Sequence, residues 1–86
     1  MAKIEMYTTQ WCGYCARARA LLEKKGAAFD EMDVMEDEAK RAEMRTRSRR
    51  STVPQIFING RHIGGSDELA ALESEGKLDA LLAQSG

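Results

Sequence analysis

Cys12 and Cys15 are the only cysteines in the 86-residue chain, and they stand three positions apart. On a helix this spacing brings two Cα atoms within the roughly 4.4–6.8 Å that a disulfide requires. A thiolate in such a pair can attack other disulfides. The alternatives are half of a zinc site or two thiols without a redox role, but for a zinc site the chain has no second cysteine pair and a single histidine, His62. The pair therefore predicts reversible thiol–disulfide exchange.

The residues around the pair place it where a strand ends and a helix begins. Lys3–Tyr7 alternates polar and apolar side chains, as a short strand does. Gly13–Lys25 is rich in Ala, Leu, Arg and Lys and is followed by Gly26, a typical helix stop. Cys12 then lies at the helix N-terminus, where free N–H groups and the helix dipole favour a thiolate. We expect Cys12 to be the exposed nucleophile and Cys15, one turn later, the shielded resolving thiol.

The rest of the chain supplies the elements that must hold this helix end. Alternation and turn signals predict a strand at Phe29–Val34, a helix at Glu36–Arg47, strands at Gln55–Ile58 and Arg61–Ile63 joined by an Asn59-Gly60 turn, a helix from Ser66 as its cap to Glu75, and a short turn or helix at Lys77–Ala83. The order β-α-β-α-β-β-α indicates an α/β fold with a four-stranded mixed sheet flanked by helices. We expect one domain over residues 1–86.

Composition excludes several classes of protein. The chain is 43% hydrophobic and 31% charged, which argues against disorder. Thirteen basic and fourteen acidic residues leave a net charge of −1, so we expect no nucleic-acid partner. No apolar run approaches the roughly 18 residues of a membrane span, and no leader pattern is present. We expect a cytoplasmic protein without membrane contact, in a compartment that keeps thiols reduced.

Three blocks of sequence carry a more specific likeness. They are Tyr7–Cys15 (YTTQWCGYC), Ser51–Gly60 (STVPQIFING) and His62–Leu69 (HIGGSDEL). Their order and spacing resemble the glutaredoxin family, in its short bacterial dithiol class, over residues 3–83. The resemblance implies a thioredoxin-like fold and a glutathione-dependent oxidoreductase that reduces protein–glutathione mixed disulfides and protein disulfides. Cys12 and Cys15 would be its catalytic residues.

The resemblance also implies a glutathione site. The residues that it assigns to this site are Tyr14, Arg41, Thr52, Val53, Pro54, Gly65, Ser66 and Asp67. In the family the proline is cis and the residue before it, here Val53, offers its backbone to a peptide-like ligand; from the residues alone, a trans proline opening a strand would be preferred. Ser66 and Asp67 would meet the γ-glutamyl end of glutathione at a helix N-terminus. Arg41 would meet its glycine carboxylate.

Two positions depart from the commonest family pattern. Thr9 stands where many relatives have a lysine, so the helix end must stabilise the Cys12 thiolate with less help. Gly13 stands where the best-known motif has proline. Glutaredoxins with a small residue there can hold a [2Fe–2S] cluster between two monomers, with one thiolate from each (here Cys12) and two glutathiones. A cluster-bridged homodimer is therefore the alternative to a monomeric enzyme.

The resemblance to glutaredoxins also implies the partners. They are glutathione and proteins that are glutathionylated or carry disulfides. A redoxin that is reduced by thioredoxin reductase is a further alternative, which the Thr52–Gln55 and Gly64–Asp67 blocks argue against. Trp11 is expected to be scaffold, and His62 is expected at the surface of an edge strand.

Overall fold

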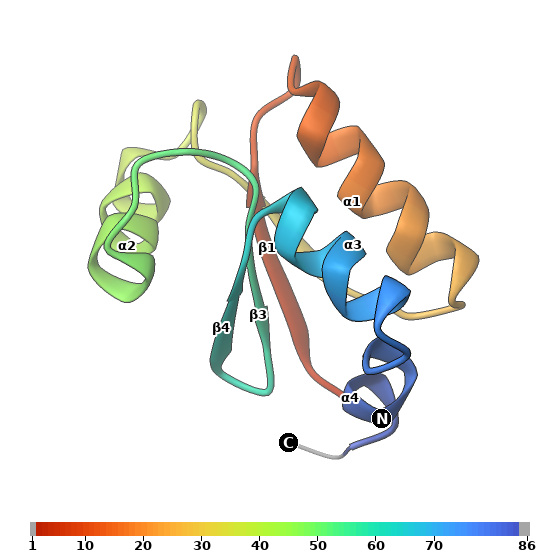
Figure 1. Ribbon diagram of the computed structural model, residues 1–86. Coiled ribbons are helices and arrows are strands. Elements are labelled where there is room, and N and C mark those ends of the chain that lie inside the picture. Colours follow the sequence, from red (N-terminus) through yellow and green to blue (C-terminus); the bar gives the residue numbers. More distant parts are fainter. Residues whose placement is uncertain (1, 85–86) are drawn as a thin grey trace.

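The computed structural model of the protein describes residues 2–84. Four strands and four helices follow one another in the chain: β1 Ile4–Thr8, α1 Gly13–Lys24, β2 Asp30–Asp33, α2 Glu38–Ser48, β3 Gln55–Ile58, β4 Arg61–Gly64, α3 Ser66–Ser74 and α4 Leu78–Ala83. The strands form one sheet in the order β2-β1-β3-β4 (Figure 1). Within residues 2–84 no helix is long and apolar enough to span a membrane.

The sheet is mixed, as predicted. β1 is parallel to β2, and β3 is antiparallel to both β1 and β4. The β3–β4 hairpin turns at Asn59 and Gly60, whose φ angles of 53° and 78° are the two positive values that a tight two-residue hairpin requires. The predicted α/β fold with helices on both faces is confirmed.

The two faces of the sheet are packed differently. Helices α1, α3 and α4 cover one face and α2 covers the other (Figure 1). The first face holds the larger apolar core, formed by Ile4, Met6, Ala18, Leu22, Ile56, Ile58, Leu69 and Leu78. This core fixes α1 and α3 against the same strands, so the first turns of both helices lie near each other.

The α2 face is held largely by one arginine. Arg47 donates hydrogen bonds to both carboxylate oxygens of Glu5, at 3.1 and 3.2 Å, and to the Tyr7 hydroxyl at 2.8 Å. Its guanidinium also lies 4.0 Å from the centroid of the Phe57 ring. The arginine lowers the pKa of the Glu5 carboxyl, and the pair stays ionised at neutral pH. Beneath it, Tyr7, Val34, Met44 and Phe57 form a second, smaller core.

A polar clamp fixes the strand end that precedes Cys12. The Thr8 hydroxyl donates to Glu31 at 2.8 Å, and the Arg19 guanidinium pairs with both oxygens of the same carboxylate. The clamp therefore joins β1, β2 and α1 just below the loop that carries Cys12.

Two predicted helix starts are wrong. α2 begins at Glu38 rather than Glu36, because the Asp33 carboxylate accepts the Met35 and Glu36 N–H groups in a turn and Asp37 caps the helix. The cap of α3 is Gly65 rather than Ser66, which is the first helical residue. The second strand is also shorter than predicted, Asp30–Asp33.

Candidate active site

Cys12 is the N-cap of α1, the position that its helix pattern predicts. Its backbone is extended, with φ −116°, and its Sγ accepts the Cys15 N–H at 3.1 Å. Sγ also lies 3.8 Å from the Val53 carbonyl oxygen, to which the thiol can donate. The side chain is half-buried and its thiol is free. A sulfur in this position can meet a partner sulfur from outside while a helix N–H stabilises its negative charge.

Cys15 differs from Cys12 chiefly in its burial. It has no exposed surface, and loss of solvent, followed by the hydrogen bond with Cys12, raises the pKa of its thiol to about 12. Cys15 is therefore a neutral thiol at physiological pH and leaves the first nucleophilic attack to Cys12. The predicted assignment of shielded and accessible thiol agrees with this burial.

This difference predicts selective alkylation. With a pKa of about 12, only roughly one Cys15 in a thousand is ionised at about pH 9, and its burial slows access further. Iodoacetamide at neutral to mildly alkaline pH should label Cys12 and leave Cys15 unmodified, as read by peptide mass mapping. Labelling of Cys15 should appear as the pH rises toward its pKa. Equal labelling of the two near pH 8 would contradict the assignment.

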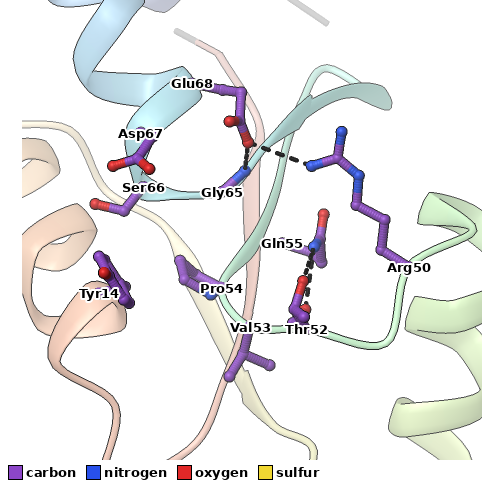
Figure 2. A pocket seen from close by; sticks show the side chains of 10 residues that line it. All are labelled: Tyr14, Arg50, Thr52, Val53, Pro54, Gln55, Gly65, Ser66, Asp67 and Glu68. Atoms are coloured by element: carbon purple, nitrogen blue, oxygen red, sulfur yellow. Dashed lines mark hydrogen bonds and ion pairs between the residues drawn. The ribbon is translucent and has the colours of Figure 1, made fainter.

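A groove of about 280 Å³ opens beside Cys12. It is lined by Tyr14, Arg50, Thr52, Val53, Pro54, Gln55, Gly65, Ser66, Asp67 and Glu68 (Figure 2). The Val53–Pro54 bond is cis, which confirms that expectation. Within residues 2–84 the Val53 N–H has no hydrogen-bond partner. The middle of the groove thus offers an unpaired backbone donor close to the reactive sulfur.

The far wall of the groove is the first turn of α3. Its cap, Gly65, has no side chain to accept the N–H groups of this turn, and those of Ser66 and Asp67 have no partner within residues 2–84. The Glu68 carboxylate instead accepts the Gly65 N–H and also pairs with Arg50 at 3.3 Å. Glu68 folds back over Gly64, whose φ is +120°. The wall therefore presents free helix N–H groups toward the groove, which suits a carboxylate.

Comparison with known protein families gives a match that includes both cysteines and the cis-proline segment. The glutaredoxin family model matches residues 4–63. The chain belongs to the glutaredoxin family. It is 55% identical over 82 residues to glutaredoxin 3 of Escherichia coli (strain K12), a match that covers 95% of this chain and 99% of that protein. The family is one of glutathione-dependent thiol–disulfide oxidoreductases, and the chain is such an enzyme.

Solved glutaredoxins have the same fold. The solution structure of glutaredoxin from Brucella melitensis is 56% identical with a TM-score of 0.83, covering 95% of this chain and 89% of that chain. The crystal structure of a buckwheat glutaredoxin–glutathione complex is 30% identical with a TM-score of 0.86, covering 94% and 76%. These matches extend over the sheet and helices that position Cys12.

This glutaredoxin brings together seven of the eight residues expected at a glutathione site. They line the groove and are Tyr14, Thr52, Val53, Pro54, Gly65, Ser66 and Asp67. Arg41 lies outside it, in a separate hollow on α2 with Glu38 and Arg45.

Two other residues lie differently from what the sequence predicts. Trp11 was expected as scaffold but is 88% exposed beside Cys12, because the loop carries it away from both cores. His62 was expected at the surface but is half-buried and bonded to Gln55.

Three groove residues of this glutaredoxin were missed by sequence reasoning. Arg50 belongs to a run of arginines, which the sequence alone does not distinguish from a solvated face. Glu68 and Gln55 stand in a predicted helix and a predicted strand, and neither element by itself assigns them to a ligand site. One signal was available in the sequence: Gln55 is the one polar residue in the run Gln55–Ile58. Glu68 stands three residues after Gly65, a spacing typical of a side chain that folds back on a cap N–H, but it is informative only once Gly65 rather than Ser66 is known to be the cap.

Proposed function

We propose that this glutaredoxin removes glutathione from protein–glutathione mixed disulfides with Cys12 as nucleophile. The Cys12 thiolate attacks the glutathione sulfur, the protein–glutathione S–S bond breaks, and the protein leaves as a thiolate that takes up a proton. A second glutathione thiolate then attacks the sulfur of the Cys12-bound glutathione. That step releases oxidised glutathione and restores the Cys12 thiolate.

For protein disulfides we propose that Cys15 completes the reaction. Attack by Cys12 leaves a mixed disulfide with the substrate protein, and Cys15, one turn away, displaces the substrate thiol. The resulting Cys12–Cys15 disulfide is then reduced by two glutathiones. The burial of Cys15 supports this order, because a buried thiol with a raised pKa meets no outside disulfide and reaches only the sulfur already bonded at Cys12. Cys15 gives up its proton as it attacks, and the departing substrate thiolate takes up a proton.

One observation carries the proposal: the Cys12 Sγ lies 3.8 Å from Val53 O, at a groove whose other wall is a helix N-terminus. An extended tripeptide beside Val53 could pair with its free N–H while its sulfur meets Cys12. We propose that its γ-glutamyl carboxylate takes the N–H groups of Ser66 and Asp67, and that the Asp67 carboxylate holds its amino group. Tyr14 and Thr52 border the same groove and support the assignment.

We keep Arg41 as the proposed partner of the glycine carboxylate. It forms no ion pair within residues 2–84, so its charge is available to a ligand. We also infer that the enzyme works in the cytoplasm, where glutathione keeps thiols reduced.

The groove assignment predicts the effect of Asp67→Asn. Loss of one charge-assisted hydrogen bond should raise KM for glutathione about tenfold and change kcat little. The measurement is a glutathione-coupled assay on a small glutathione mixed disulfide. Asp30→Asn, the same change at an exposed aspartate outside the groove, is the control. Arg41→Ala in this assay tests the glycine end. An unchanged KM in both Asp67→Asn and Arg41→Ala would refute the proposed binding mode.

A second candidate function, a [2Fe–2S] carrier, is favoured by one feature. An added Cβ at Gly13 would meet no atom within 4 Å, so the loop beside Cys12 is uncrowded. Within residues 2–84 no three His, Cys, Asp or Glu side chains gather as a metal site. One chain would therefore contribute only the Cys12 thiolate to a cluster. A second chain and two glutathiones would have to supply the other ligands. Visible absorption and elution volume after anaerobic reconstitution with glutathione decide: a colourless monomer rejects this function.

A further inference from the structure

The buried amide of Gln55 holds the segment that forms the middle of the groove. Gln55 is 1% exposed, and its Nε2 donates to both Thr52 O, at 3.0 Å, and Thr52 Oγ1, at 3.2 Å (Figure 2). Its Oε1 lies 2.7 Å from Nε2 of His62. Both amide protons and the amide oxygen are thus engaged. Although Gln55 borders the groove, its polar atoms are turned to Thr52 and His62 rather than to a ligand.

His62 determines which way this amide faces. Oε1 can only accept, so His62 must carry its proton on Nε2. If the proton were on Nδ1, Nε2 would need a donor, and the Gln55 NH₂ group would have to turn from Thr52 to His62. Burial, followed by the charge of Arg50, lowers the pKa of His62, and the ring is neutral at pH 7 with one proton to place. The histidine tautomer and the Thr52 contacts are therefore coupled.

The hairpin register, on the turn side of a β-bulge, places His62 within reach of Gln55. Ile58 pairs with Arg61 and Phe57 with His62, but Ile56 pairs with Gly64, so β4 has one extra residue at Ile63. His62 lies opposite Phe57, on the face to which Gln55, two residues earlier, also points. The imidazole stacks on the Phe57 ring with centroids 5.0 Å apart. The ring is thus held by packing while its Nε2 holds the amide.

The Gln55 contacts leave Thr52 with one free hydrogen-bonding group. Its carbonyl and hydroxyl oxygens both accept from the amide, so the hydroxyl proton is free to donate. Thr52 is exposed and lines the groove next to the unpaired Val53 N–H. Two adjacent donors, one from each residue, are thereby presented to an acceptor in the groove.

We propose that Gln55, oriented by His62, is a positioning residue that sets the affinity for the peptide part of glutathione by aiming the Thr52 hydroxyl and the Val53 N–H into the groove. This proposal rests on the glutathione site proposed above. Neither Gln55 nor His62 contacts the reacting sulfurs, so the pair acts on binding and leaves the chemistry of Cys12 alone.

The test is a double-mutant cycle in steady-state kinetics with glutathione and a small glutathione mixed disulfide. Gln55→Met keeps the size of the side chain without its hydrogen bonds, and His62→Phe keeps the stacking on Phe57 without the Nε2 donor. Each should raise KM for glutathione about five- to tenfold, with kcat within about twofold of wild type. The two together should raise it no further, because they break one chain of contacts. Gln84→Met, at an exposed glutamine, is the control.

A second cycle asks whether the effect passes through Thr52. Thr52→Val should raise KM in the wild-type background and add nothing in Gln55→Met. The alkylation rate of Cys12 should stay at the wild-type value in every variant. Additive KM effects, parallel losses of kcat, or KM values unchanged from wild type would each overturn the positioning role.

The outcomes also separate this proposal from the glutathione site itself. If wild type shows no saturation with glutathione, the site is wrong. If wild type saturates and the His62→Phe variant, which leaves both cores intact, keeps its KM, the positioning role alone is wrong.

Discussion

Cys12→Ser should reduce deglutathionylation to the uncatalysed rate, a loss of more than about a thousandfold, while Cys15→Ser should stay within about threefold of wild type. A serine hydroxyl is not ionised near neutral pH and cannot replace the thiolate that attacks the mixed disulfide. At position 15, however, the stabilising donor is the backbone N–H, 3.1 Å from the Cys12 Sγ. Serine retains that N–H, so the nucleophile keeps its environment.

The measurement compares both variants on two substrates. On a small glutathione mixed disulfide, only Cys12→Ser should be inactive. On a protein disulfide, Cys15→Ser should stop at a mixed disulfide between Cys12 and the substrate, visible as a species that reductant dissociates on a non-reducing gel. Equal inactivity of the two variants on the small substrate would show that Cys15 takes part in the one-thiol reaction, against the proposed mechanism.

Gly64→Ala, one residue before the groove wall begins, should be strongly destabilising. With φ at +120°, the backbone of Gly64 disfavours any side chain, and an added Cβ would lie 2.5 Å from Glu68 Oε1. Glu68 would have to move, and its bonds to the Gly65 N–H and to Arg50 would break. Strain of about 1–2 kcal/mol and about 1 kcal/mol of lost hydrogen bonding should lower the free energy of unfolding by about 2–3 kcal/mol.

The control separates strain from contact. Gly26→Ala also places a side chain at positive φ, +68°, but its Cβ meets nothing within 4 Å, so it should cost only about 1 kcal/mol. Urea denaturation of the two variants gives the difference. Gly64→Ala should also raise KM for glutathione, since the wall of the groove shifts, whereas Gly26→Ala should leave it unchanged. Equal destabilisation by the two would show that Glu68 moves aside freely.

Local chemistry explains which features could be predicted. The Asn59-Gly60 turn and the position of Cys12 before a helix depend on neighbouring residues, and both were predicted correctly. The Arg50–Glu68 pair joins residues 18 apart through the packing of α3 on the sheet, which no local pattern encodes. The hydrogen bond between His62 and Gln55 joins side chains on neighbouring strands, and alternation within one strand does not show which polar partner a side chain meets on the other.

The Cys12-Gly13-Tyr14-Cys15 motif could also be interpreted from neighbouring residues alone. Its spacing places Cys12 at the N-cap and Cys15 one turn later, on the same buried face as Ala18 and Leu22. The burial of Cys15 therefore follows from the apolar face of α1. The position of Arg41 could not be read in this way. It depends on how α2 packs on the sheet, through Met44 in the second core and the bonds of Arg47 to Glu5 and Tyr7.

The exposure of Trp11 gives this enzyme a built-in optical probe. It is the one tryptophan of the chain, and it immediately precedes Cys12 while standing almost wholly in water. Emission excited at the red edge of the protein band therefore comes from a single indole at the mouth of the active site. Each change at the neighbouring sulfur, from thiolate to glutathione adduct to internal disulfide, alters the surroundings of that fluorophore. The catalytic cycle can thus be followed in real time by stopped-flow fluorescence, without a label and without mutation.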